Sequence, residues 1–250
     1  MEIVGGGFLA THLRSIDHLH SDTVVFAAGV SGSYGAAQAD FDRDAELVYR
    51  SIVDCQRTGR RLAYFSTSSV GMYGGQVSVG REDGPVFPTS SYGRHKLAME
   101  AVIAHAGIDY LILRLAYPVG PGQRAHQFLP SLVGQVRAGS VRIHRGARRD
   151  VIDVADVVEL VGALLSSGAS REIVNVASGH AIPVERIVAR LEERLDAAVR
   201  RQYVDVPVEP SVSVAKLRRL APCAERMGFG DTYHESVIDR YLAATAVAPY

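Results

Sequence analysis

The feature that most constrains this chain is the alternation of short apolar runs with longer amphipathic segments. Runs rich in β-branched and aromatic residues predict strands at 1–4, 23–27, 61–65, 110–115 and 173–176. Segments with apolar residues at i, i+3 and i+4 predict helices at 8–16, 40–58, 91–106, 155–165 and 184–195. Strands without a polar face are buried on both sides, and helices between them imply parallel crossovers. The sequence therefore predicts an α/β fold with a Rossmann-like, doubly wound parallel sheet and a small C-terminal lobe.

The charge balance and the cysteines narrow the class of protein. The 27 basic and 27 acidic residues cancel, so no net field attracts nucleic acid or an anionic membrane, and we expect neither as a partner. Cys55 and Cys223 lack CxxC spacing, and no apolar run approaches the roughly 18 residues of a membrane span. These features predict a cytoplasmic protein. His12, His18 and His20 lack a nearby carboxylate pair at ligand spacing, so we expect no metal site.

A glycine-rich turn follows the first predicted strand. Gly5, Gly7 and Ala10 satisfy the GxGxxG/A pattern. The first glycine permits a tight turn, the second lets the backbone approach a pyrophosphate, and the alanine keeps the helix close to the sheet. We therefore expect Gly5, Gly7, Phe8 and Leu9 to contact a dinucleotide, NAD or NADP. The alternative is a purely structural turn between a strand and a helix.

One part of this dinucleotide pattern is missing. The pattern calls for an acidic residue about 20 positions after the last glycine, on a second strand, to hold the adenosine ribose. No carboxylate lies between Asp22 and Asp40, and only 13 residues separate Ala10 from Val24. The strand and crossover helix that usually hold the adenosine half therefore have no room, and the choice between NAD and NADP stays open.

A second motif, YxxxK, lies at the start of the helix predicted at 91–106, in the segment SYGRHK. Residues four apart share one helical face, so the Tyr92 phenol and the Lys96 ammonium project side by side. A phenol has an unperturbed pKa of about 10, and a nearby cation lowers it. We expect Lys96 to lower the pKa of Tyr92 and to reach the ribose of the nicotinamide. A tyrosine and a lysine at this spacing also occur by chance on exposed helices.

Hydroxyl side chains follow the strand that precedes the YxxxK segment. Residues 62–65 lead directly into Ser66, Thr67, Ser68 and Ser69. The carboxyl ends of parallel strands open into the crevice where doubly wound folds bind ligands. The glycine turn, the hydroxyl cluster and the YxxxK motif follow one another along the chain. Their combination favours a binding site more strongly than any one of them does alone.

With these motifs, residues 1 to about 195 resemble the extended short-chain dehydrogenase/reductases, also called the NAD-dependent epimerase/dehydratase family. Residues 64–70 resemble the segment that ends in that family's catalytic Ser or Thr. Alignment from the strand gives this role to Thr67. Alignment backward from Tyr73 and Gly74, with residues 71–72 as an insertion, favours Ser69 instead. We prefer Thr67.

Three later segments carry the same resemblance. Residues 27–29 resemble the loop that packs on the cofactor, residues 113–122 the strand and turn beside the nicotinamide, and residues 149–156 a late motif whose arginine often meets a substrate phosphate. The resemblance implies cofactor contacts from Ala27, Ala28, Gly29, Tyr92, Lys96, Tyr117, Pro118 and Val119, and substrate contacts from Ser69, Tyr117 and Arg149. Tyr117 departs from the pattern, because many members have an asparagine there.

The resemblance implies hydride transfer between NAD(P)H and a ketone or secondary alcohol on a sugar, with nucleotide-linked sugars as the expected class. Thr67 would hold the substrate oxygen, Tyr92 would donate or accept its proton, and Lys96 would assist. One alternative is an epimerase or dehydratase that recycles its cofactor, although a dehydratase normally needs an acidic pair where Ser68 and Ser69 stand. A second alternative is a non-redox binding or sensor protein on the same fold.

The same reasoning gives an expected domain plan and assembly. We expect residues 1–165 to form the dinucleotide-binding core. Residues 166–250, with parts of 117–150, should form a mostly helical substrate lobe that is not an independent domain. The helices at 40–58 and 91–106 should pair across a twofold axis in a homodimer, as in the family that the chain resembles.

Overall fold

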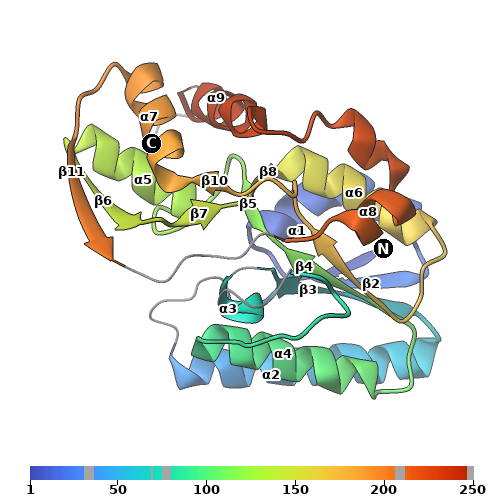
Figure 1. Cartoon of the computed structure of the whole chain (residues 1–250). Coiled ribbons are helices and arrows are strands. Elements are labelled where there is room, and N and C mark those ends of the chain that lie inside the picture. Colours follow the sequence, from blue (N-terminus) through green and yellow to red (C-terminus); the bar gives the residue numbers. More distant parts are fainter. Residues whose placement is uncertain (31–36, 69, 75–79, 206–211, 247–250) are drawn as a thin grey trace.

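The computed structural model describes residues 1–30, 37–68, 70–74, 80–205 and 212–246 (Figure 1). Its large sheet has five parallel strands in the order β1 (Glu2–Val4), β2 (Thr23–Phe26), β3 (Arg61–Thr67), β4 (Tyr110–Leu115) and β9 (Glu172–Val176). Helices cover both faces, so the predicted α/β class and parallel sheet are confirmed. The five strands lie at the five predicted places.

Alternate residues of each strand feed two separate apolar layers. Val24 and Phe26 of β2 face a layer completed by α2 (Gln38–Thr58) and α4 (Ser91–Ala104), which lie side by side below the sheet in Figure 1. Val25 faces the opposite layer, which is completed by α1 (Phe8–Leu13), α6 (Val154–Ser166) and α8 (Ala215–Leu220). Strands that are buried on both sides need the continuous apolar runs seen in the sequence.

Strand β1 forms one edge of the large sheet. It pairs with β2 alone, in the register Glu2↔Val24 and Ile3↔Val25. Between α1 and β2 the chain makes only the 3₁₀ helix η1 (Arg14–Leu19). In the part of the chain that the structure describes, no strand lies beyond β1, which agrees with the missing second-strand unit.

A second apolar cluster forms the lobe above the carboxyl edge of the sheet (Figure 1). Its helices are α5 (Phe128–Arg137), α7 (Val184–Leu195) and α9 (Tyr233–Ala246). Three two-stranded sheets complete it, namely β5 (Tyr117–Val119) with β8 (Val151–Asp153), β6 (Ser140–Arg145) with β11 (Arg200–Asp205), and β7 (Arg148–Arg149) with β10 (Ile182–Pro183).

The chain returns to the large sheet after residue 165, where we expected the core to end. Strand β9 is the fifth strand of the sheet. Helix α8 and the 3₁₀ helix η2 (Pro222–Arg226) also pack on the core, through buried Leu217 and Ala224. The lobe is therefore built from residues 117–153 together with α7, β11 and α9. No helix among the described residues is long and apolar enough to cross a membrane.

Candidate functional site

The glycine turn lies against the loop that follows β2. Gly5 has φ +130°, and a Cβ there would lie 2.7 Å from the Ala27 carbonyl oxygen and 2.8 Å from the Ala28 nitrogen. Only glycine fits such a conformation and such a close approach. A Cβ at Gly6 or Gly7 would meet nothing within 4 Å, so the space above the turn is open. A tight turn with open space above it fits the pyrophosphate of a dinucleotide.

The same loop reaches the YxxxK helix two residues later. A Cβ at Gly29 would lie 2.6 Å from Lys96 Nζ and 3.2 Å from Asp44 Oδ1. The predicted cofactor residues of the glycine turn, of the 27–29 loop and of α4 are therefore one contiguous surface, although they come from three separate parts of the sequence.

Helix α4 presents Tyr92 to the end of β3. The helix begins after Ser90, whose Oγ accepts a hydrogen bond from the Gly93 amide at 3.0 Å. A hydrogen bond joins the Tyr92 hydroxyl to the side chain of Thr67, the last residue of β3. The structure thus brings together the two hydroxyls that we assigned to the substrate oxygen.

Of the two serines that follow Thr67, Ser68 belongs to the described residues and Ser69 does not. Ser68 is 3% exposed, and its Oγ has no hydrogen-bond partner among the described residues. A buried hydroxyl without a partner costs free energy, which makes Ser68 a second candidate for a substrate contact. Ser69 lies outside the described residues, so its role as a substrate contact stays a prediction.

Burial controls the ionisation of Tyr92. Burial, followed by the negative charge of Asp44, raises the pKa of Tyr92 to about 12, and the hydrogen bond from Thr67 opposes this shift. Lys96 donates instead to the Tyr64 hydroxyl at 3.1 Å and lies 3.8 Å from Asp44 Oδ1. The net shift in the protein alone is upward, and the lowering of the Tyr92 pKa by Lys96 stays a prediction.

The sequence reasoning missed the partners of Lys96. Asp44 lies on α2 and is 3% exposed, and its Oδ2 is 2.6 Å from His95 Nε2. One signal could have found it. Asp44 occupies the i+3 position after Phe41 and the i−4 position before Val48, on the apolar stripe of its helix. A carboxylate on a buried stripe needs a partner.

The residues expected at the substrate lie in the lobe above this centre. The Arg149 guanidinium stacks 5.0 Å from the ring centroid of Tyr117 and 5.6 Å from that of Phe128. Tyr117, Pro118 and Val119 form β5, which is paired with β8. A Cβ at Gly120, directly after β5, would lie 3.5 Å from Phe8 of α1. The end of β5 is thus beside the glycine turn.

A buried ion pair supports the strand that carries Thr67. Arg114 of β4 binds both carboxylate oxygens of Glu100, at 3.0 and 2.7 Å, and each side chain is 3% exposed. Ser66 donates to Glu100, and Arg114 donates to the Tyr73 hydroxyl at 3.0 Å. The network joins β3, β4 and α4 directly beneath the hydroxyl cluster.

Comparison with known proteins places these features in a family. The sequence model of the "NAD dependent epimerase/dehydratase family" matches residues 10–177. The chain belongs to this family. The match covers more than half of the chain and includes Thr67, Tyr92, Lys96 and Arg149.

Two curated relatives show which members of the epimerase/dehydratase family this chain is similar to. It is 30% identical over 210 residues to dTDP-6-deoxy-L-talose 4-dehydrogenase (NAD(P)(+)) of Kitasatospora kifunensis, a match that covers 77% of this chain and 64% of the relative. It is 23% identical over 178 residues to dTDP-4-dehydro-6-deoxyglucose reductase of Escherichia coli, covering 64% and 55%. The matches thus span less than two thirds of these relatives.

Solved structures of similar proteins show the same fold. The structure of RMD from Pseudomonas aeruginosa complexed with NADPH superposes with a TM-score of 0.77 at 18% identity, covering 97% of this chain and 98% of that one. A UDP-galactose 4-epimerase gives a TM-score of 0.79 at 19% identity. Likeness at this level of identity shows the Rossmann-like architecture of the family.

The histidines near the glycine turn have other contacts. His12 Nε2 lies 2.9 Å from the Pro121 carbonyl oxygen, so this side chain ties α1 to the turn after β5. Among the described residues, no group of three or more His, Cys, Asp or Glu side chains could hold a metal ion.

Proposed function

We propose that this member of the epimerase/dehydratase family is an NAD(P)-dependent oxidoreductase. It reduces a keto group, or oxidises a secondary alcohol, on a sugar that is linked to a nucleotide, in polysaccharide or secondary-metabolite biosynthesis. The observation that carries the proposal is the hydrogen bond between the side chains of Thr67 and Tyr92, with the buried Lys96 one helical turn after Tyr92. The names of the two curated relatives, a dTDP-sugar dehydrogenase and a dTDP-sugar reductase, support this substrate class.

The cofactor site that we propose uses the contiguous surface described above. The contacts are Gly5, Gly7, Phe8, Leu9, Ala27, Ala28, Gly29, Tyr92, Lys96, Tyr117, Pro118 and Val119. When bound there, the nicotinamide supplies or accepts the hydride. The open space over Gly6 and Gly7 and the close packing of Gly5 on the next loop support this assignment.

The chain's own residues supply the proton and hold the substrate oxygen. A tyrosine is protonated at neutral pH, and burial raises the pKa of Tyr92 further, to about 12, so Tyr92 is the group that gives a proton to the oxygen of a ketone during reduction. Thr67 donates a hydrogen bond to the same oxygen and meets the charge that develops on it. Lys96 holds the cofactor ribose and stabilises the phenolate that proton transfer leaves behind.

Arg149 and Tyr117 are the proposed contacts to the nucleotide diphosphate. A guanidinium suits phosphate because it forms paired, charge-assisted hydrogen bonds. The rings of Tyr117 and Phe128 hold the Arg149 guanidinium by cation–π contacts. Ser69 is a further proposed contact to the sugar.

Substitution of Tyr92 by Phe tests the proposed function. We expect Tyr92→Phe to lower kcat by roughly 10²- to 10⁴-fold, the usual contribution of general acid–base catalysis, and to weaken cofactor binding far less, because the other proposed cofactor contacts stay in place. The assay follows NADH and NADPH consumption with dTDP- and UDP-linked 4-keto sugars, and fluorescence titration measures cofactor binding. Tyr49→Phe is the matched control, because Tyr49 is 52% exposed on α2. Full activity of Tyr92→Phe would refute the assignment of the proton donor.

The same assays separate the proposal from its alternatives. An epimerase or dehydratase that recycles its cofactor converts the sugar without net consumption of NAD(P)H. A sensor protein binds neither NADH nor NADPH at millimolar concentration, or binds one of them without turning over any sugar. Stoichiometric oxidation of NAD(P)H by a keto sugar supports the reductase.

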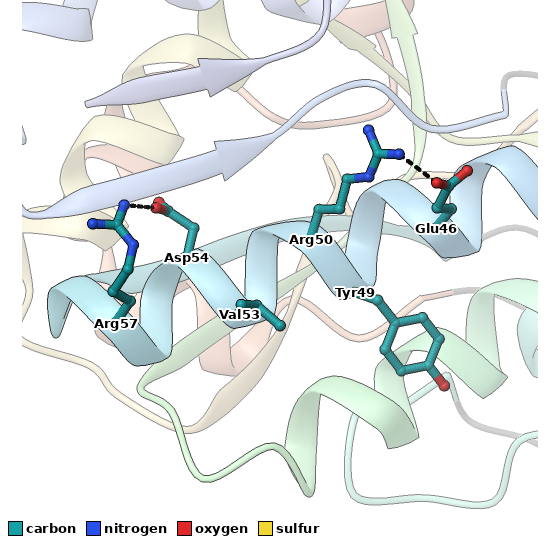
Figure 2. Close-up of a pocket in the computed structure, with 6 residues that line it drawn as sticks. All are labelled: Glu46, Tyr49, Arg50, Val53, Asp54 and Arg57. Carbon is teal, nitrogen blue, oxygen red and sulfur yellow. Dashed lines mark hydrogen bonds and ion pairs between the residues drawn. The ribbon is translucent and has the colours of Figure 1, made fainter.

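We infer that two copies of the chain associate through α2 and α4. Figure 2 shows a hollow on the exposed side of α2, lined by Glu46, Tyr49, Arg50, Val53, Asp54 and Arg57. Tyr49 and Val53 are 52% and 61% exposed, and ion pairs of Arg50 with Glu46 and of Arg57 with Asp54 flank them. An apolar centre with a charged rim is typical of an interface between proteins. None of the proposed site residues lines this hollow.

Analytical ultracentrifugation tests the dimer. We expect the wild type to sediment as a dimer and Val53→Glu to sediment as a monomer, because a buried unpaired carboxylate would oppose the contact. Leu19→Glu is the control, since Leu19 is 58% exposed on η1. A monomeric wild type would contradict the inference. A cytoplasmic location is a further part of the proposal, supported by Cys55 and Cys223, which are not joined in a disulfide.

A further inference from the structure

The carboxylate of Asp44 is the one acidic group of α2 that is buried against the proposed catalytic helix. Its Oδ1 accepts a hydrogen bond from the Val30 amide at 3.0 Å and lies 3.8 Å from Lys96 Nζ. Its Oδ2 is 2.6 Å from His95 Nε2. The two oxygens thus join the loop after β2 to two successive residues of the YxxxK motif.

The surroundings of Lys96 leave Asp44 as its principal counter-charge. Lys96 is 2% exposed, and burial lowers its pKa, whereas Asp44 and, to a smaller degree, Glu100 oppose this shift. Tyr64 of β3 accepts a hydrogen bond from Nζ and places its ring 4.8 Å below it. Glu100 is already bound by two nitrogens of the buried Arg114 guanidinium, which weakens its hold on the lysine.

His95 contacts the second oxygen of the Asp44 carboxylate. Its side chain is 12% exposed and packs against the Phe41 ring at 4.9 Å. Phe41 and Asp44 are neighbours on α2, so both contacts of His95 come from one helix. The imidazole therefore fixes the carboxylate in a single orientation, with the other oxygen toward Lys96.

We propose that Asp44, oriented by His95 and the Val30 amide, is a positioning residue that holds the Lys96 ammonium under Gly29 and keeps it charged. The proposal rests on the proposed function only in taking Lys96 as the group that meets the cofactor ribose. Without Asp44, the buried ammonium loses its nearest carboxylate. It then deprotonates at lower pH and is no longer fixed beside the 27–29 loop.

The composition of the chain allows a direct measurement, because it contains only two lysines, Lys96 and Lys216. Protein labelled with isotope-enriched lysine gives two side-chain NMR signals, and Lys216→Arg assigns them. Lys216 is bound to Glu172 at 2.8 Å, which makes it an internal reference. No cofactor is needed, so the result stands whether or not the chain proves to be an oxidoreductase.

Three variants test whether Asp44 determines the NMR signal and the titration of Lys96. We expect Asp44→Asn to lower the pKa of Lys96 by about 1 unit or more, the usual effect of an opposite charge at this range. The matched control is Asp42→Asn, since Asp42 is exposed on the same helix and accepts a hydrogen bond from Gln38, at 2.8 Å. Gly29→Ala should also move the Lys96 signal, because its Cβ would lie 2.6 Å from Nζ, although it changes no ionisable group.

A kinetic readout distinguishes positioning from a general loss of fold. Asp44→Asn should lower kcat/KM for the cofactor on the order of 10²-fold and shift the alkaline limb of its pH profile to lower pH, while Asp42→Asn leaves both unchanged. His95→Gln keeps a donor for Asp44 and should retain more activity than His95→Ala.

The outcomes that overturn the proposal are specific. If Lys96 has the same chemical shift and titration in Asp44→Asn as in Asp42→Asn, Asp44 does not hold the ammonium. If Asp44→Asn does not fold, the chemical shift and titration of Lys96 are compared in the same way for Gly29→Ala and His95→Ala. Failure of the proposed function would appear instead as a wild type with the expected Lys96 signals but no cofactor binding.

Discussion

Glu100→Gln is expected to destabilise the protein far more than loss of a surface ion pair. The substitution keeps the shape of the side chain but leaves the Arg114 guanidinium buried beside a neutral amide. It also removes the carboxylate to which Ser66 donates, one residue before Thr67. The damage should therefore reach both the stability of the sheet and the proposed catalytic centre.

The magnitude follows from burial and geometry. Glu100 and Arg114 are each 3% exposed and are joined by two hydrogen bonds of 3.0 and 2.7 Å. Removal of one partner of such a buried pair costs about 3–5 kcal/mol, because the remaining charge stays desolvated. A domain is typically stable by about 5–15 kcal/mol, so the variant would lose roughly a fifth or more of its stability.

Urea unfolding followed by circular dichroism measures this loss. With a slope of about 3 kcal/mol per M, the midpoint should fall by about 1–1.7 M. The control is Glu46→Gln, which breaks an exposed pair with Arg50 and should cost about 0.5 kcal/mol or less. Arg114→Met added to Glu100→Gln should destabilise by less than the sum of the two single changes. A cost for Glu100→Gln as small as that for Glu46→Gln would refute the reasoning.

Three further predictions concern the site. Gly5→Ala should abolish cofactor binding in a fluorescence titration and lower the melting temperature, because Gly5 has φ +130° and no room for a Cβ; an unchanged titration curve would contradict this. Thr67→Ala should reduce kcat more than Ser68→Ala if Thr67 holds the substrate oxygen, and the reverse order in steady-state kinetics would transfer the role to Ser68. Tyr92 has a folded pKa of about 12 against about 10 when unfolded, so its stabilising effect is complete below pH 10 and is lost as the pH rises toward 12. Wild-type stability should therefore fall more steeply than that of Tyr92→Phe over this range in chemical denaturation, and parallel curves would count against the raised pKa.

The sequence predicted the large sheet well because its strands are buried on both faces. The five strands carry nearly continuous apolar runs, and helix α2 ends at Thr58 where Gly59 takes the left-handed conformation. The small sheets of the lobe were not predicted, because strands as short as Arg148–Arg149 are too brief to show a period of two. The helix predicted at 8–16 divides into α1 and the tighter turn of η1.

The site was predictable where the chemistry is local and not where it depends on tertiary contacts. Tyr92 and Lys96 share a helical face and Thr67 ends a strand, so the order of these motifs along the chain, together with the family resemblance, was enough to select them. The partner of Lys96 is Asp44, which is distant in sequence and meets it only because α2 and α4 pack together. For this reason the sequence did not predict that burial and the charge of Asp44 raise the pKa of Tyr92 in the protein alone.

The position of β1 at the edge of the large sheet affects how the enzyme would bind and release its dinucleotide cofactor. A dinucleotide gripped mainly through its nicotinamide half should dissociate quickly and show little preference between NAD and NADP. Rapid exchange suits a catalyst that takes up a fresh reductant for every turnover. Rapid exchange does not suit an enzyme that must keep the same cofactor molecule bound while it oxidises the substrate and then reduces it again.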